Sequence, residues 1–585
     1  MQISHIKNTT RLADLVRSFS LLSVFLLLMT TVTSCSKTAD EVDTGDIPIE
    51  AHPSDALFAL DRLLQVEIEV DEADWDVLRL QGRTFGEVLR GDCLAEPFES
   101  PYDWFEATIS IDGEEVGQVG IRKKGFLGSL DDFRPSLKIG VDRFVDGQTY
   151  ASQTRLTFNN QRQDPSRLNA CMAYSIFADA GLPASRCNLA HVTVNGVSLG
   201  IYNQVESIKP PMLDYHFGNS EGALLEGTLS DFREGWLGTF DAKNSAAEEL
   251  GDEFLEITRI LEESSDADLI ADLENHFNMD QFFQFWAMEA LIGHWDSYTG
   301  NTNNYWMYRD EADGLFQFLP WGTDAVLRGK DPFGEDAPRS VTTSSSLSNR
   351  LYNSEEGQLR YYEALQYLLD NVWDEDVLIA RMEAFLELAE PIEEQMDNEY
   401  FDDYVDELRR FLTKRRKWIE DELEDGFPSA SDEYGSSICM AELGSIEASF
   451  TTTYGSLYSD NPFNEGEGTC SGVYDDEVFE FDDIGGVAGP DGEGTALFGV
   501  ITSFEDSSGV LVYAGIPEEL VEANTSYEFD WMGTWGVMLY APPNTNYAWQ
   551  VIAYIDNGAV SFGEVTTDWD GLVEGSMYGD LVMFQ

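Results

Sequence analysis

The sequence predicts an α+β fold in which a large mixed domain is followed by an all-β domain that is sandwich-like or a small barrel. Strand-like runs with glycine and asparagine turns occur between residues 118 and 206, and apolar residues recur at helical spacing from 325 to 425. From residue 436 to the end, short alternating apolar runs are separated by Gly, Asn, Asp and Pro. A hydrophobic fraction of 43% and an aromatic fraction of 12% suffice to bury such cores.

Residues 1–35 have the pattern of an export signal. Three basic residues precede the apolar run LLSVFLLLMTTV, and the segment ends in Val-Thr-Ser-Cys at Cys35. The run is short for a membrane span, and small residues before a cysteine are typical of a bacterial lipoprotein cleavage site. We therefore expect Cys35 to carry a lipid and the chain to be extracytoplasmic, at the outer membrane or cell surface of a double-membrane bacterium. An ordinary secretory signal with an incidental Cys35 is the alternative.

The chain is strongly acidic, with 108 Asp and Glu residues against 35 Lys and Arg residues and a formal charge of −73. Because the apolar fraction is that of a folded protein, we expect this charge on the surface, and residues 36–54 as an acidic, disordered tether. Such a surface opposes nucleic-acid and anionic-membrane partners, which leaves the lipid as the expected membrane attachment. It suits divalent cations or a basic protein partner, although adaptation to high salt explains the same charge.

Five cysteines remain besides Cys35. An export compartment permits disulfides, and an odd number leaves at least one thiol free or paired between chains. We expect Cys439 to pair with Cys470, since both lie in the C-terminal part. The spacing of the cysteines matches no zinc motif.

Four polar residues between 294 and 324 occur in the order that phosphoryl transfer requires. His294, Asp296 and Asn301 match the H-x-D-x-x-x-x-N pattern of protein kinases, and Asp324 follows a predicted hairpin made of the apolar runs NYWMYRD and GLFQFLP. In that chemistry one carboxylate orients the attacking hydroxyl, while an amide oxygen and a second carboxylate hold Mg²⁺. The H-x-D-x-x-x-x-N pattern alone also occurs by chance in loops. The other motifs of the chain are therefore needed to support a kinase site.

A basic cluster lies upstream in this otherwise acidic chain. Arg122, Lys123 and Lys124 are surrounded by glycines that allow close approach of the backbone to phosphate, and Lys138 lies in the alternating strand Ser-Leu-Lys-Ile. A strand lysine facing a nucleotide is the kinase arrangement. A solvated hairpin with surface lysines is the alternative.

Two further elements follow the basic cluster. Residues 164–181 predict a helix that begins with Asp164 as its cap and ends at Gly181, without an obvious glutamate to pair with Lys138. Asn195-Gly196 predicts a two-residue hairpin turn that leads to Glu206, which either serves the site or pairs on the surface with Lys209.

These segments together resemble the CotH kinase family, the spore-coat-type atypical kinases, over roughly residues 55 to 425. The segments that carry the resemblance are VGIRKKGFLGSL with PSLKI (119–139), VNGVSLGIYNQVE (194–206), HWDSYTGNTNNYWMY (294–308), FLPWGTD (318–324) and RRFLTKRRKWIEDEL (409–423). The resemblance implies an atypical, protein-kinase-like two-lobed domain over residues 55–427. It also implies transfer of the γ-phosphoryl group of ATP to protein Ser or Thr with Mg²⁺ or Mn²⁺.

Carried over residue by residue, the resemblance makes Lys138 the phosphate-binding lysine, Glu206 a nucleotide-site acid and Asp296 the catalytic residue. Asn301 and Asp324 become the metal ligands, with Asn303 and Asn304 as alternative amides. Arg122 and Lys124, from the basic cluster, complete the expected nucleotide site. This chain departs from the family's Pro-Trp-Asp-x-Asp pattern, because Gly322 replaces the first Asp. If that first carboxylate were the metal ligand, the chain would be a weak enzyme or a pseudokinase; we expect Asp324 to hold the metal.

The last 150 residues, 436–585, predict a separate β domain of unknown function. Four tryptophans in it, Trp531, Trp535, Trp549 and Trp569, either pack in its core or line a carbohydrate groove. A structural or adhesive surface lipoprotein that binds glycans through this domain is therefore the alternative to the kinase.

Overall fold

The computed structural model describes residues 52–584, except 330–337, 431–437, 493, 530–532, 544 and 546. The predicted signal, Cys35 and all but the end of the acidic tether lie outside the described residues. Within the described ranges, no helix combines the length and the apolar character that crossing a membrane requires. Mixed helices and strands make up residues 55–423, and strands dominate from residue 440 onward.

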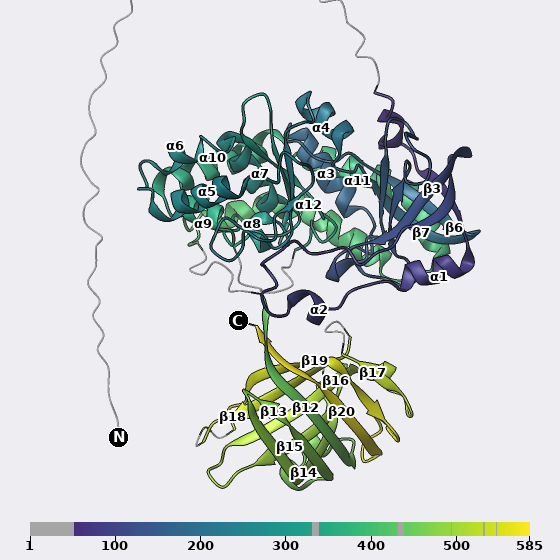
Figure 1. The fold of residues 1–585 in the computed structure, drawn as a ribbon, viewed down its shortest axis with the longest axis vertical. Helices are drawn as coiled ribbons and strands as arrows, with labels where there is room; N and C mark the ends of the chain where they lie inside the picture. Colours follow the sequence, from purple (N-terminus) through teal and green to yellow (C-terminus); the bar gives the residue numbers. More distant parts are fainter. Residues whose placement is uncertain are drawn as a thin grey trace, which may run out of the picture. The chain divides into compact units, whose positions relative to one another are not determined.

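The first part of the chain forms a closed barrel of seven strands in the order β1-β2-β3-β4-β5-β7-β6 (Figure 1). Its apolar side chains alternate along the strands and fill one buried cluster, in which Ile121, Ile139 and Phe158 are fully buried. The strands are β1 (Leu64–Val70), β2 (Phe105–Ile111), β3 (Glu114–Lys124), β4 (Ser136–Gly140), β5 (Arg155–Asn159), β6 (Cys187–Val194) and β7 (Val197–Val205). The predicted strand around Lys138 and the hairpin at Asn195-Gly196 are confirmed as β4 and the β6–β7 pair.

Helix α3 (Asn169–Asp179) begins later than the sequence predicts. Asp164 is not its N-cap residue: its carboxylate accepts hydrogen bonds from the backbone N–H groups of Ser166 and Asn169, at 3.0 and 2.9 Å. Arg167 adopts a φ of +65°, which keeps residues 164–168 out of the helix. The predicted end is confirmed, since Gly181 has a φ of +72° directly after the helix.

Helices dominate residues 210–423, around a four-stranded sheet of order β11-β10-β8-β9. The predicted hairpin is confirmed as the antiparallel pair β10 (Tyr305–Arg309) and β11 (Phe316–Pro320). The other strands are β8 (Ala223–Gly227) and β9 (Asp241–Ala242). The helices are α4 (Pro210–Phe217), α5 (Gly251–Glu263), α6 (Leu269–Leu273), α7 (Met279–Ile292), α8 (Tyr298–Asn301), α9 (Ser346–Tyr352), α10 (Glu355–Asn371), α11 (Glu375–Gln395) and α12 (Phe401–Leu423).

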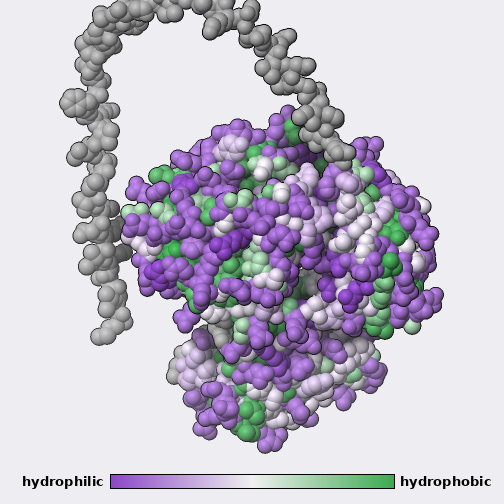
Figure 2. Space-filling view, turned by 45° about the horizontal axis from the view of Figure 1, so that its top comes forward, coloured by the Kyte–Doolittle hydropathy of each residue, from purple (hydrophilic) through white to green (hydrophobic). Residues whose placement is uncertain are grey.

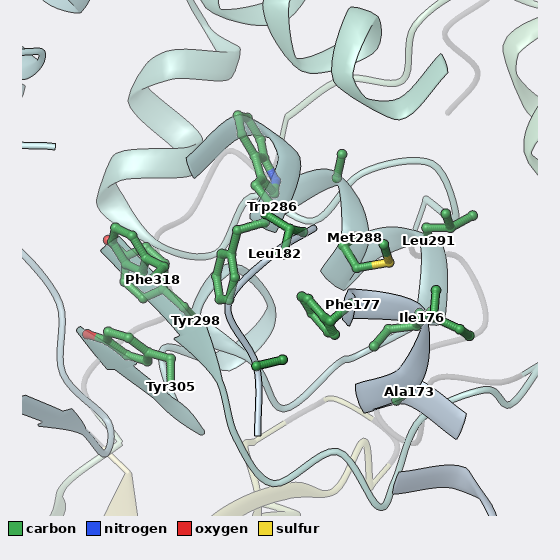
Figure 3. Packing of buried hydrophobic residues seen from close by; sticks show 14 of the residues in the cluster. Ala173, Ile176, Phe177, Leu182, Trp286, Met288, Leu291, Tyr298, Tyr305 and Phe318 are labelled. Atoms are coloured by element: carbon green, nitrogen blue, oxygen red, sulfur yellow. The ribbon is translucent and has the colours of Figure 1, made fainter. Parts of the chain in front are cut away.

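One aromatic cluster supports the loop before α8. Tyr298 packs against Tyr305 and Phe318, with ring centroids 4.5 and 5.1 Å apart, and Figure 3 shows these three rings beside Trp286 of α7. All four side chains are buried. Because interiors are close-packed, this cluster fixes the backbone that carries Asp296.

The C-terminal strands form one sheet rather than two separate ones. Strand order runs β17-β19-β18-β16-β15-β14-β13-β12-β20, and a further pairing of β19 with β20 closes the sheet around a common core (Figure 1). The sequence leaves a sandwich and a small barrel open, because alternation along strands does not reveal which strands pair; this closed sheet is the barrel-like form. The strands are β12 (Met440–Thr453), β13 (Glu467–Tyr474), β14 (Glu477–Pro490), β15 (Thr495–Ser503), β16 (Gly509–Pro517), β17 (Ser526–Glu528), β18 (Trp535–Ala541), β19 (Gln550–Phe562) and β20 (Leu572–Phe584).

The predicted Cys439–Cys470 disulfide is wrong. Cys439 pairs with Cys93, 346 residues away, and Cys171 pairs with Cys187, with Cα atoms 5.6 and 5.1 Å apart respectively. Cys470 is a free thiol in the core of the C-terminal sheet. Cys439, its expected partner, is already bonded to Cys93, and burial raises the pKa of the Cys470 thiol to about 12.

The surface in Figure 2 is largely hydrophilic, with hydrophobic residues scattered in small groups. Few Asp and Glu residues in the described part of the chain are buried, so most of the acid lies at or near the surface, as expected. The two-lobed arrangement and the domain limits at residues 427 and 436 remain predictions.

Candidate active site

A cleft of about 510 Å³ collects most of the residues that the sequence singled out. Strands β3, β4 and β5 supply one wall, and the loops that contain residues 296–304 and 321–324 supply the facing wall. The predicted site residues that line the cleft are Arg122, Lys124, Lys138, Asp296 and Asp324.

Strand geometry creates the cationic wall. Arg122 of β3 lies directly opposite Lys138 of β4 in the antiparallel register, so both side chains face the same side of the sheet. Lys124 is two residues farther along β3 and shares that face. Lys123, the residue between, points the other way and is buried in an ion pair with Asp132 at 2.9 Å. Alternation therefore divides the basic cluster into three cleft residues and one structural lysine.

Lys138 is a desolvated cation. Burial and the nearby Arg122 guanidinium lower its pKa from 10.5 to about 7, against the opposing effect of Glu226. No carboxylate in the described part of the chain lies within ion-pair distance of its ammonium group. The sequence analysis found no glutamate partner for this lysine, and the structure supplies none.

Lys124 is also a partly buried lysine with a lowered pKa. Its Nζ donates to Oδ1 of Asn159 at 2.5 Å and lies 5.7 Å from the ring centroid of Trp321. Burial lowers its pKa to about 8, although Asp324 opposes that shift. An anion in the cleft would therefore meet two lysines whose charges protein carboxylates do not neutralise.

Asp296 is held by three asparagine amides. The Nδ2 atoms of Asn301 and Asn303 donate to its Oδ1 at 2.9 and 3.1 Å, and that of Asn304 donates to its Oδ2 at 2.6 Å. Burial raises the pKa of the Asp296 carboxyl, and these three hydrogen bonds oppose the shift. The spacing of the asparagines after Asp296 thus has a physical reason: the short helix α8 (Tyr298–Asn301) and the turn that follows it bring them back onto the carboxylate.

A buried glutamate under this loop holds α8 in place. Glu289 of α7 accepts hydrogen bonds from the backbone N–H and the hydroxyl of Thr299, at 3.0 and 2.6 Å. Ser297 caps α8 by accepting from the N–H of Gly300 at 3.2 Å. No sequence motif indicated Glu289, because its role depends on where α7 ends.

Asp324 lies just beyond β11 and faces the cleft, as the strand-then-loop pattern predicted. Burial raises its pKa to about 6, and the negative charges of Asp164 and Asp296 add to the rise. Two carboxylates repel each other in a desolvated cleft, and a cation bound nearby would relieve that repulsion.

Gly322, the departure from the family pattern, has a structural cause. Its φ is +57°, and a Cβ at this position would meet the side-chain amide of Asn304. The same amide is bound to Asp296, so it has little freedom to move. Asn304 occupies the space that a side chain at position 322 would need.

The donor set fits Mg²⁺ or Mn²⁺, which prefer carboxylate and amide oxygens. Asp324 supplies a carboxylate, and Asn303 and Asn304 line the cleft, whereas Asn301 is exposed and does not line it. The described residues contain no cluster of three or more His, Cys, Asp or Glu side chains that would hold a metal by themselves. A bound ion would therefore need the amides, or oxygens of a nucleotide, to complete its coordination.

Glu206 is not in the cleft. It is buried in a two-contact ion pair with Arg186, whose Nη2 and Nε lie 2.6 and 2.9 Å from its carboxylate oxygens. The paired strands β6 and β7 bring these residues together, and Lys209 is not the partner. Glu226 of β8 lines the cleft instead, and it pairs with Lys243 at 2.5 Å. The sequence suggested Lys209 only as a surface partner, and it did not indicate Glu226 or Lys243, which belong to no motif; all three line the cleft.

The family model for the CotH kinase protein matches residues 121–419, which are 299 of the 585 residues. The chain belongs to the CotH kinase family. The match contains Arg122, Lys124, Lys138, Asp296 and Asp324, and it leaves out the C-terminal sheet.

Several known proteins are similar to parts of this chain. The inner spore coat protein H of Bacillus subtilis is 21% identical over 302 residues, 48% of this chain and 81% of that protein. Spore coat protein homolog 1 and invasin CotH7, both of Rhizopus delemar, are 25% and 24% identical over 183 and 178 residues, covering 29% of this chain each and 29% and 30% of those proteins.

A solved structure of the Helicobacter pylori proinflammatory kinase CtkA aligns with 52% of this chain and 94% of its own, at 13% identity and a TM-score of 0.28.

Proposed function

We propose that this protein is an atypical protein kinase that transfers the γ-phosphoryl group of ATP to Ser or Thr residues of a protein. The observation that carries the proposal is the arrangement of charge in the cleft. Lysines without carboxylate partners line one wall, and two mutually repelling carboxylates, Asp296 and Asp324, line the other. A nucleotide phosphate chain with a divalent cation is the ligand class that neutralises both walls at once.

Each cleft residue then has a distinct role. Lys138, Lys124 and Arg122 bind phosphate oxygens, and Asp324 with the cleft asparagines binds the cation, which spreads the charge that develops on the phosphates. Asp296 accepts the proton of the attacking hydroxyl group while its asparagine hydrogen bonds fix its orientation. The raised pKa of the Asp296 carboxyl brings its basicity closer to neutral pH.

The acceptor and the location are part of the same proposal. A chain with a formal charge of −73 favours a basic protein acceptor and opposes nucleic acid. The pattern around Cys35 supports a lipid-anchored, extracytoplasmic protein, and two disulfides fit an oxidising compartment.

Intact-mass analysis tests the transfer reaction. The full chain is incubated with ATP and Mg²⁺ or Mn²⁺, alone and with histone H1 as a basic acceptor. The intact masses of both proteins are then measured by mass spectrometry. Added phosphate in the parent and not in Asp296→Ala supports the kinase. An added adenylate group would instead identify the protein as an adenylyltransferase. No added mass would favour a pseudokinase.

Glycan binding is a second candidate, favoured by one observation. Trp569 is 60% exposed and stacks on Tyr458, which is 57% exposed, with ring centroids 6.5 Å apart. Exposed, parallel aromatic rings suit the apolar face of a sugar. Of the other tryptophans, Trp535 and Trp549 are partly buried, and Trp531 lies outside the described residues. A glycan array with the full chain and its Trp569→Ala variant tests this function. The full chain should bind a glycan, and the variant should lose that binding.

A further inference from the structure

Residues 83–102, which we call the wall segment, form part of the cleft although they precede the family match. The segment contains one short helix, α2 (Phe85–Leu89), and is otherwise irregular apart from an isolated bridge. The residues of the segment that line the cleft are Arg83, Pro97, Phe98, Glu99, Ser100 and Tyr102.

The wall segment contacts the cationic wall directly. The Oγ of Ser100 accepts a hydrogen bond from Nη1 of Arg122 at 3.0 Å, and the Tyr102 hydroxyl donates to the carbonyl of Gly125 at 2.9 Å. These bonds connect the segment to β3 and to the turn that follows it. They also fix the direction of Arg122, a predicted phosphate-binding residue.

Arg83 adds a cation to this side of the cleft. Its Nη2 donates to the Glu99 carbonyl at 2.7 Å, and its guanidinium lies 5.1 Å from the ring centroid of Phe126. Its Nε is buried without a hydrogen-bond acceptor in the described structure. Arg83 lines the cleft, and no ion pair among the described residues neutralises its guanidinium, so an anionic ligand group beside it would be bound favourably.

The same segment is attached to the C-terminal sheet by three kinds of contact. Cys93 is covalently bonded to Cys439, and the N–H of Gly91 donates to the carbonyl of Met440 at 3.1 Å. Arg90 forms ion pairs with Asp556 and Asp580 at 2.9 and 2.8 Å.

Close packing accompanies these bonds. Val88, Leu89 and Leu94 share a buried cluster with Met440 and Val582 of the sheet. Gly86 lies so close to Asp556 that a Cβ at Gly86 would overlap its carboxylate. The approach of α2 to the sheet therefore depends on a glycine.

On the basis of the proposed function, we propose that the C-terminal sheet positions the wall segment as a ligand-binding wall of the cleft, with Arg83 contacting an anionic group of the bound nucleotide. An irregular segment with a single short helix has little structure of its own to hold it. If it were released from the sheet, nucleotide binding would have to order it, and that cost would weaken the affinity. The C-terminal domain thus acts on the site without contributing a ligand contact itself.

The test uses the full chain and four variants. Cys93→Ser/Cys439→Ser removes the covalent attachment, Gly86→Ala disrupts the attachment without changing a thiol, and Arg83→Met removes the ligand contact alone. Arg259→Ala, which removes two exposed ion pairs on α5, is the matched control. Hydrogen exchange of residues 83–102 is measured without nucleotide, and the Kd for ATP with Mg²⁺ is measured by calorimetry.

The two attachment variants should exchange faster across residues 83–102 and bind ATP about tenfold more weakly, since ordering even one or two side chains costs that much. Arg83→Met should weaken binding with unchanged exchange, and Arg259→Ala should match the parent in both. Faster exchange with parental affinity, or unchanged exchange in both attachment variants, overturns the inference. A parent that binds no ATP refutes the proposed function and the ligand role of Arg83, while the exchange data still decide whether the sheet holds the segment.

Discussion

Nucleotide binding should be accompanied by uptake of a proton on Lys138, and the Lys138→Met variant should lose this uptake. In the free protein, burial and Arg122 lower the pKa of Lys138 to about 7, so at pH 8 only roughly one tenth of its side chains carry a charge. A phosphate chain beside the amine favours the charged form and raises this pKa. Binding at pH 8 should therefore draw roughly 0.9 proton onto Lys138, falling to roughly 0.1 at pH 6, where the amine is already charged.

The affinity should fall as well. A hydrogen bond to a charged group contributes about 1.5–3 kcal/mol, so Lys138→Met should weaken ATP binding about 10- to 150-fold. The free protein should not lose stability, because a lysine whose pKa is lowered from 10.5 to about 7 makes the fold less stable at every pH below 10.5, and methionine lacks this cost. A weaker site in an equally stable or more stable protein is the expected signature.

Calorimetry at pH 8 in buffers of different ionisation enthalpy measures the proton uptake directly. The parent should show an uptake that Lys138→Met reduces by roughly 0.9 proton, and Lys414→Met, at an exposed position on α12, should retain it. Equal proton uptake by the parent and Lys138→Met would refute the assignment of Lys138 to the phosphate site.

Three other changes test the remaining assignments. Asp324→Ala should weaken ATP binding in the presence of Mg²⁺ much more than in its absence, because the carboxylate holds the cation; identical Mg²⁺ dependence in calorimetry would exclude it as a ligand. Gly322→Asp should lower phosphoryl transfer rather than restore a family acid, since its Cβ would displace the Asn304 amide from Asp296; a faster variant in the same transfer assay would contradict this. Cys35→Ser should move the protein from the detergent phase to the aqueous phase if Cys35 carries the lipid; unchanged partitioning would indicate another anchor.

Local patterns in the sequence predicted the elements that carry the site. Alternation around Lys138 and the two apolar runs flanking residues 310–315 gave β4 and the β10–β11 hairpin, because strand periodicity is a property of neighbouring residues. Alternation also separates Lys123, which is buried in an ion pair, from the cleft residues on either side of it.

Contacts between distant segments were beyond reach of the same patterns. Arg186 and Glu206 meet only because β6 and β7 pair, and Cys93 meets Cys439 across 346 residues. Glu226 reaches the cleft from a strand whose sequence carries no motif. Asp164 before a proline predicts a helix start, but its carboxylate instead stabilises a turn by accepting from the N–H groups of Ser166 and Asn169. Helix α3 therefore begins later than the sequence predicts.

Phosphoryl transfer itself is the central claim, and one measurement tests it most directly. The parent and Asp296→Ala are incubated with ATP, Mg²⁺ and histone H1, and phosphate on either protein is followed by intact mass over time. We expect phosphate to accumulate with the parent and to slow about 10²- to 10⁴-fold in the variant, while both bind ATP with similar affinity. Equal rates for the two proteins, or no phosphate with a parent that binds ATP and Mg²⁺, would contradict the claim.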